Sequence, residues 1–106
     1  MAKGGFPGMQ QLMKQAQKMQ ENMAKLQDEI GNREFSVSAG GGAVTVVIYG
    51  RKELKSIEIS PECVDPDDIE MLEDLIISAV NEAIRVADET MNSEMGKLTG
   101  GVNLGI

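Results

Sequence analysis

The first long pattern in the chain is helical, and it lies between Met9 and Ile30. Apolar residues recur there at intervals of three and four, the spacing that places side chains along one side of an α-helix. We call this row the apolar seam, and it consists of Met9, Leu12, Ala16, Met19, Met23, Leu26 and Ile30. Gly31 and Asn32 then form a helix stop signal. The sequence therefore predicts a helix over residues 9–30 with one apolar side.

The middle of the chain has a two-residue periodicity. Apolar and polar residues alternate over residues 35–39, a glycine triplet interrupts the run, and residues 43–49 are almost entirely β-branched. After a polar turn at residues 50–53, alternation returns at Ile57 and Ile59. This pattern predicts a three-stranded antiparallel meander with residues 43–49 in its centre. The glycine triplet lies between strands and no GKS or GKT follows it, so it indicates a hairpin turn rather than a phosphate-binding loop.

A second helix is predicted after residue 65. Asp65 is a suitable N-cap, Pro66 suits the first helical position, and Asp67 and Asp68 would face the positive end of the helix. The apolar stripe of this helix consists of Ile69, Leu72, Ile76, Val80, Ala83, Ala87 and Met91. We expect the helix to end near Met95.

These elements predict one small α+β domain with the order α-β-β-β-α. We expect that domain to occupy residues 9–95, between a flexible lead at residues 1–8 and a flexible glycine-rich tail at residues 96–106. A chain of 106 residues buries a thin core. Its three aromatic residues and eight methionines specify that core loosely.

The apolar seam needs something to cover it. A helix over residues 9–30 would be about 33 Å long, whereas strands of this length span about 20–23 Å. The overhanging part could pack against the second helix of the same chain or against a second copy of the protein. We favour a homodimer, because the thin sheet also leaves an apolar face and an edge to cover.

Composition excludes several classes of function. The chain has no histidine and a single cysteine, Cys63. It therefore lacks the common metal constellations, the Ser-His-Asp and Cys-His nucleophiles, and any internal disulfide. We expect a protein without catalytic activity, metal, cofactor or small-molecule substrate. No signal peptide and no membrane-length apolar run are present, which indicates a cytoplasmic protein without a membrane partner.

Charge is distributed unevenly. Residues 1–60 hold eight Lys and Arg against six Asp and Glu, whereas residues 61–106 hold two against eleven. Within the first helix, Lys14, Lys18 and Lys25 lie away from the apolar seam and form a basic, amide-rich side. That side is interpreted either as a phosphate-binding surface or as an ordinary solvated helix surface, in which Glu21 and Lys25 form an i, i+4 pair.

The chain resembles the YbaB/EbfC family of bacterial nucleoid-associated proteins over nearly its full length. The resemblance rests on the Met/Gln/Lys-rich opening helix and on three strings: GGGAVTVVIYGRKELKSIEIS (residues 40–60), DPDDIEMLEDLIISAVNEAI (residues 65–84) and MGKLTGG (residues 95–101). It implies a homodimer shaped like tweezers, with long helices projecting from a sheet core, that binds DNA in the nucleoid without catalysis.

Two functions remain open from the sequence. The first is a homodimer that binds duplex DNA with little sequence specificity, with Lys14, Lys18 and Lys25 contacting phosphates. The alternative is a protein-interaction adaptor that binds replication, repair or recombination proteins through its Met-rich helix. Methionine side chains suit adaptable contacts, and net acidity suits a basic partner.

Overall fold

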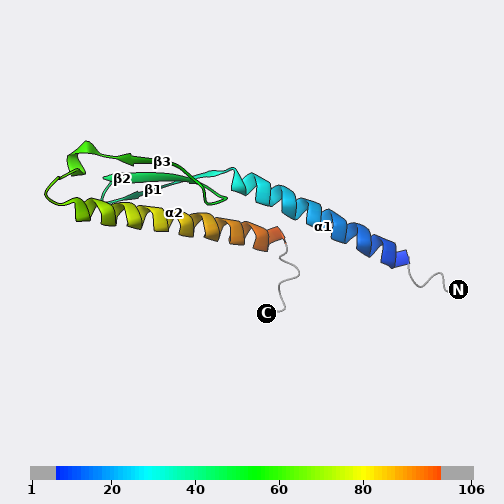
Figure 1. Cartoon of the computed structure of the whole chain (residues 1–106). Helices are drawn as coiled ribbons and strands as arrows, with labels where there is room; N and C mark the ends of the chain where they lie inside the picture. The colour runs from blue at the N-terminus through cyan, green and yellow to red at the C-terminus, as the bar shows by residue number, and fades with distance from the viewer. Residues whose placement is uncertain (1–6, 99–106) are drawn as a thin grey trace.

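The order of elements along the chain is the predicted α-β-β-β-α order (Figure 1). The structure is a computed structural model that describes residues 7–98. Its elements are α1 (Pro7–Gly31), β1 (Glu34–Ala39), β2 (Val44–Tyr49), β3 (Leu54–Ile59), a short 3-10 helix η2 (Pro61–Cys63) and α2 (Ile69–Leu98). Most of the predicted lead and tail lies outside the described residues. The helix α2 continues beyond the predicted end at Met95.

The sheet is the predicted antiparallel meander, with β2 between β1 and β3. The glycine triplet forms the turn between β1 and β2, as predicted. Gly40, Gly41 and Gly42 have φ angles of 64°, 67° and 98°. Other residues rarely adopt this left-handed region, which explains why the turn is built from glycine.

The core lies between α2 and one face of the sheet. Val44, Val46 and Ile48 point from β2 toward α2, and each is at most 1% exposed. The side of α2 that meets them consists of Ala79, Ala83 and Ala87, all fully buried. Their four-residue spacing keeps them on one side of the helix, and their small size allows the helix to lie close to the sheet. The opposite face of the sheet carries polar residues, such as Ser38 and Thr45, whose hydroxyl groups lie 2.9 Å apart in a hydrogen bond.

The helix α2 leaves one strand uncovered. It contacts β1 and β2 extensively. Pairing places Ile59, Ile57 and Leu54 of β3 beside the buried residues of β2, on the same face of the sheet. These three side chains nevertheless remain 36–43% exposed. We call them the β3 strip. The described part of the chain thus carries an apolar strip at one edge of its own core.

The helix α1 extends away from the sheet, and its C-terminal part lies beside the end of α2 (Figure 1). As a result the molecule is elongated, with principal extents of 83 × 26 × 16 Å. Ile30, at the sheet end of α1, is fully buried. Leu12 and Met13, near the free end, are each 63% exposed.

The start of α2 differs from the prediction. The helix begins at Ile69, and the backbone N–H of Met71 donates to Asp68 Oδ1 at 3.3 Å. Asp65 instead closes a preceding turn, in which its Oδ1 accepts from the backbone N–H of Asp67 at 2.9 Å. The predicted cap at Asp65 was therefore wrong, because several consecutive aspartates can cap and local sequence does not choose between them.

A substitution at Gly50 is expected to destabilise the fold. A Cβ atom at this position would lie 1.9 Å from the carbonyl oxygen of Ile30, a backbone atom that cannot rotate away. Gly50→Ala should lower the free energy of unfolding by about 3 kcal/mol, a typical cost of severe overpacking. Urea denaturation measures this loss. Gly96→Ala is the matched control, because nothing lies within 4 Å of that position, and it should leave stability unchanged or slightly raised. A stable Gly50→Ala variant would show that this contact is not rigid.

Candidate nucleic-acid interface

Most basic side chains of the sheet and α2 form ion pairs. Five described basic residues there have carboxylate partners: Lys52 with Asp88 at 2.5 Å, Lys55 with Glu34 at 2.8 Å, Arg51 with Glu53 at 2.9 Å, Lys97 with Glu94 at 3.3 Å, and Arg85 with both Glu82 and Glu89. The hydrogen bond to Glu34 raises the pKa of Lys55, and the hydrogen bond from Arg85 lowers the pKa of Glu82. These cations are already matched within the chain.

The lysines of α1 are different. Lys14, Lys18 and Lys25 are exposed, and none of them forms an ion pair within residues 7–98. The predicted Glu21–Lys25 pair is not formed among those residues either. At 100° per residue the three lysines lie within about 40° of one another around the helix axis, and they extend over roughly 16 Å. They form one row, which we call the lysine row.

The surroundings of the lysine row change along the helix: no carboxylate lies within one turn of Lys14, whereas Glu21, Asp28 and Glu29 lie within one turn of Lys25. Lys14 and Lys18 line a shallow surface hollow of about 340 Å³ together with Gln11 and Gln15. No acidic residue occurs in α1 before Glu21, which lies on the same side of the helix as the row. Positive charge is therefore concentrated toward the free end of α1, where amide side chains accompany it. This arrangement can bind phosphate groups and donate hydrogen bonds to them.

The structure divides the apolar seam into three parts. Met9, Leu12, Ala16 and Met19 are exposed, Met23 and Leu26 are half-buried, and Ile30 is fully buried in its own chain. The inner part of α1 contacts α2, and Met19 and Leu98 border a common hollow. Part of the seam is thus covered within the chain, and the outer part is available to a second molecule.

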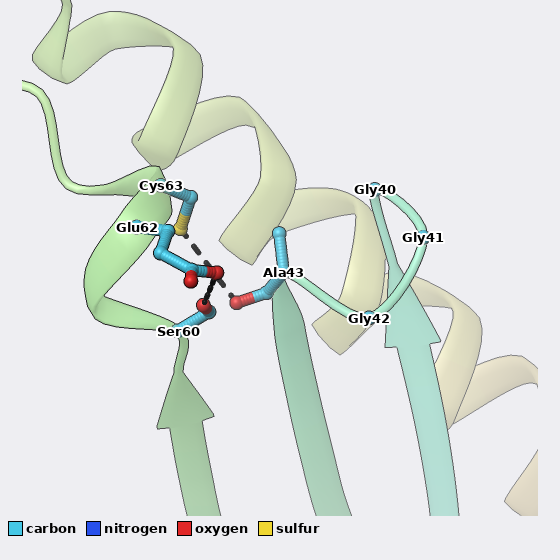
Figure 2. A pocket seen from close by; sticks show the side chains of 7 residues that line it. All are labelled: Gly40, Gly41, Gly42, Ala43, Ser60, Glu62 and Cys63. Atoms are coloured by element: carbon cyan, nitrogen blue, oxygen red, sulfur yellow. Dashed lines mark hydrogen bonds between the residues drawn. The ribbon is translucent and has the colours of Figure 1, made fainter.

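A second hollow, of about 350 Å³, lies between the glycine turn and η2 (Figure 2). Cys63 donates a hydrogen bond from Sγ to the carbonyl oxygen of Ala43 at 3.6 Å. Ser60 Oγ donates to Glu62 Oε1 at 3.4 Å, and Glu62 is one of the residues that line this hollow. The negative charge of Glu62 disfavours a phosphate ligand. The residues that the structure describes contain no group of His, Cys, Asp or Glu able to hold a metal ion.

Comparison with known proteins identifies the family. The sequence profile of the YbaB/EbfC DNA-binding family matches residues 4–102. The chain belongs to this family.

Relatives and one solved structure agree with the YbaB/EbfC assignment. The chain is 60% identical to a nucleoid-associated protein of Ruminiclostridium cellulolyticum, over 96% of this chain and 94% of the relative. It is 58% identical to one of Clostridium novyi, over 98% of this chain and 96% of the relative. A crystal structure of an uncharacterized Helicobacter pylori protein matches with a TM-score of 0.72 at 21% identity, over 84% of this chain and 94% of that one, which supports the fold.

One cation of this YbaB/EbfC chain escaped the sequence analysis. Arg33 lies two residues after the end of α1, is exposed, and forms no ion pair with any residue in the described range. Like the three lysines of α1, Arg33 therefore has no carboxylate partner among the described residues, and only the fold reveals this.

No helix within residues 7–98 is long and apolar enough to span a membrane.

Proposed function

We propose that this chain is a nucleoid-associated protein that binds duplex DNA as a homodimer with little sequence specificity, and that Lys14, Lys18 and Lys25 contact its phosphates. The observation that carries the proposal is the contrast between the two sets of cations. Those of the sheet and α2 are matched by carboxylates, whereas the lysine row has no partner among the described residues. Membership of a DNA-binding family and the names of the relatives support the same function and a place in the nucleoid.

The β3 strip supports the dimer. Leu54, Ile57 and Ile59 continue the apolar face of the core past the edge of α2 and remain 36–43% exposed. A second copy that packed against this strip would bury it and would cover the edge strand. The exposed part of the apolar seam is a second surface that the partner could cover. A dimer of either kind carries two lysine rows.

Low sequence specificity follows from the types of side chain on α1. Base readout in the major groove relies mostly on Arg, Asn or Gln directed at base edges. The helix α1 contains no arginine, so readout of guanine by arginine is absent from it, while its glutamines and Asn22 could contact adenine and give a weak sequence preference. Lysine contacts with phosphate carry no direct sequence information. The net charge of −7 opposes the approach of DNA and is expected to keep affinity modest.

A protein-interaction adaptor is the second candidate. The observation that favours it is the exposure of Met9, Leu12 and Met13, which are 57%, 63% and 63% exposed near the free end of α1. Methionine and leucine side chains there could enter an apolar groove of a protein involved in DNA replication, repair or recombination.

Salt titration tests the proposed function and separates the two candidates. Gel shifts with a random and a defined duplex are measured across a salt series. Phosphate binding predicts that log affinity falls linearly with log salt, with a slope of up to about −5 if six lysines of a dimer contact phosphates. The two duplexes should bind within about threefold of each other. No duplex binding at low salt would contradict the proposal and leave the adaptor in its place.

A further inference from the structure

The turn between β2 and β3 contacts the end of α1. The backbone N–H of Arg51 donates to the carbonyl oxygen of Gly31 at 3.2 Å, and that of Gly50 donates to the carbonyl oxygen of Arg33 at 2.9 Å. Gly50 also lies directly against the backbone of Ile30, as its lack of space for a Cβ atom demonstrates. The helix is therefore attached to the sheet through a small set of backbone contacts.

The side chain of Arg51 completes this junction. Its Nη1 donates to the carbonyl oxygen of Gly31 at 3.2 Å and to Asn32 Oδ1 at 2.8 Å. Its Nε donates to Glu53 Oε1 at 2.9 Å, and its guanidinium lies 4.2 Å from the centre of the Tyr49 ring. One guanidinium thus bridges the end of α1 and both sides of the β2–β3 turn.

Arg51 supplies what α1 lacks. The last carbonyl groups of a helix have no partners inside the helix, and a positive charge there is favourable. No basic residue occurs in the last turn of α1. Arg51, 20 residues away in sequence from Gly31, provides both the hydrogen-bond donor and the positive charge. The contact therefore caps the helix and fixes it to the sheet at the same time.

Apart from this junction, the direction of α1 is held within the described residues by the contact of its inner part with the end of α2. Ile30 is buried and Met23 and Leu26 are half-buried, whereas the outer residues are exposed. Lys14 lies about 25 Å along the helix from Gly31. A rotation of roughly 10° at the junction would therefore move Lys14 by about 4 Å. Such a shift is larger than a hydrogen bond tolerates.

We propose that Arg51 is a positioning residue that sets the direction of α1 relative to the sheet, and thereby the placement of the lysine row on DNA. The first part concerns the chain alone, and the second rests on the proposed function. Asn32 is the uncharged side chain that accepts a hydrogen bond from Arg51. Glu53 and Tyr49 hold the guanidinium in the orientation that reaches both Gly31 and Asn32.

Distances between spin labels test the first part without DNA. Gln17→Cys and Asn81→Cys in a Cys63→Ser background place one label on α1 and one on α2, and dilution with unlabelled protein removes contributions between chains. Arg51→Ala should broaden the distance distribution at least twofold, and Arg51→Lys should restore part of the loss. Lys52→Ala is the matched control, because it breaks an ion pair in the same turn without touching α1, and it should leave the width unchanged. An Arg51→Ala distribution as narrow as the parent's would overturn the proposal.

DNA binding tests the second part. Arg51→Ala should lower duplex affinity about tenfold, and Asn32→Ala, which changes no charge, should lower it in the same direction. The double variant should bind no more weakly than Arg51→Ala, because the interaction that Asn32→Ala removes is already absent when Arg51 is alanine. Lower affinity in Arg51→Ala with an unchanged distance distribution, or full affinity in Asn32→Ala, would instead mean that Arg51 contacts DNA itself. If the parent binds no DNA, the proposed function fails, while the distance measurement still decides whether Arg51 positions α1.

Discussion

Replacing Lys14, Lys18 and Lys25 together by glutamine is expected to lower the affinity for duplex DNA at least ~100-fold at low salt, since each phosphate contact releases about 0.9 counterion. The slope of log affinity against log salt should fall toward zero. These residues are exposed and lie away from the apolar seam, so circular dichroism, thermal unfolding and the oligomeric state should remain as in the parent. Fluorescence anisotropy with a labelled duplex across a salt series measures both the affinity and the slope.

A charge-matched variant is needed because the protein is already acidic. The glutamine variant removes three positive charges, which would weaken DNA binding to some extent wherever the charges were removed. Ser78→Glu, Asn81→Glu and Asn92→Glu together produce the same change in net charge at exposed positions of α2. This control should lose only a few-fold in affinity. Equal losses in the two variants would mean that net charge, rather than the lysine row, determines binding.

Ile57→Asp is expected to prevent dimer formation. Ile57 is the middle residue of the β3 strip and is 40% exposed in the single chain, so an aspartate there costs that chain little. In a dimer that covers the strip, the carboxylate would be buried without a partner. The dissociation constant of the dimer should rise at least ~100-fold, which sedimentation equilibrium at micromolar protein measures against the 11.4 kDa mass of one chain.

The neighbouring residue provides the control for this experiment. Ser56 lies on the opposite, polar face of β3, so Ser56→Asp should leave the dimer intact. The double variant Leu12→Asp, Met19→Asp tests the exposed part of the apolar seam in the same way. Dissociation in the seam variant alone would place the interface on α1 rather than on β3. A parent protein that sediments only as single chains would contradict the dimer altogether.

Local patterns were sufficient to predict the two long helices and the three strands of this fold, but not the short helix η2. Three local patterns located both helices, the three strands and the turn: apolar residues at intervals of three and four, two-residue alternation, and a glycine triplet. Each pattern depends only on residues that are close in sequence. The prediction was wrong at the start of α2, where several adjacent aspartates offered equivalent caps. It also did not single out Ala79 as part of the core, because an alanine carries a weak apolar signal.

The candidate site depends on contacts between distant parts of the chain. The sequence indicated that Lys14, Lys18 and Lys25 share one side of a helix, but it gave no means of showing that Lys52 is paired with Asp88 or Lys55 with Glu34. Those pairs arise only when the strands and α2 come together. Arg51 looked like an ordinary turn residue for the same reason, since its partners Gly31 and Asn32 belong to a different element.

The position of Tyr49 gives this protein a natural optical probe. The chain contains no tryptophan and a single tyrosine. That tyrosine is the ring over which the Arg51 guanidinium lies, at the base of α1. Its ultraviolet emission therefore comes from one place, the junction of helix and sheet. A movement of α1 at this junction would consequently change the tyrosine emission of the unlabelled, unmodified protein.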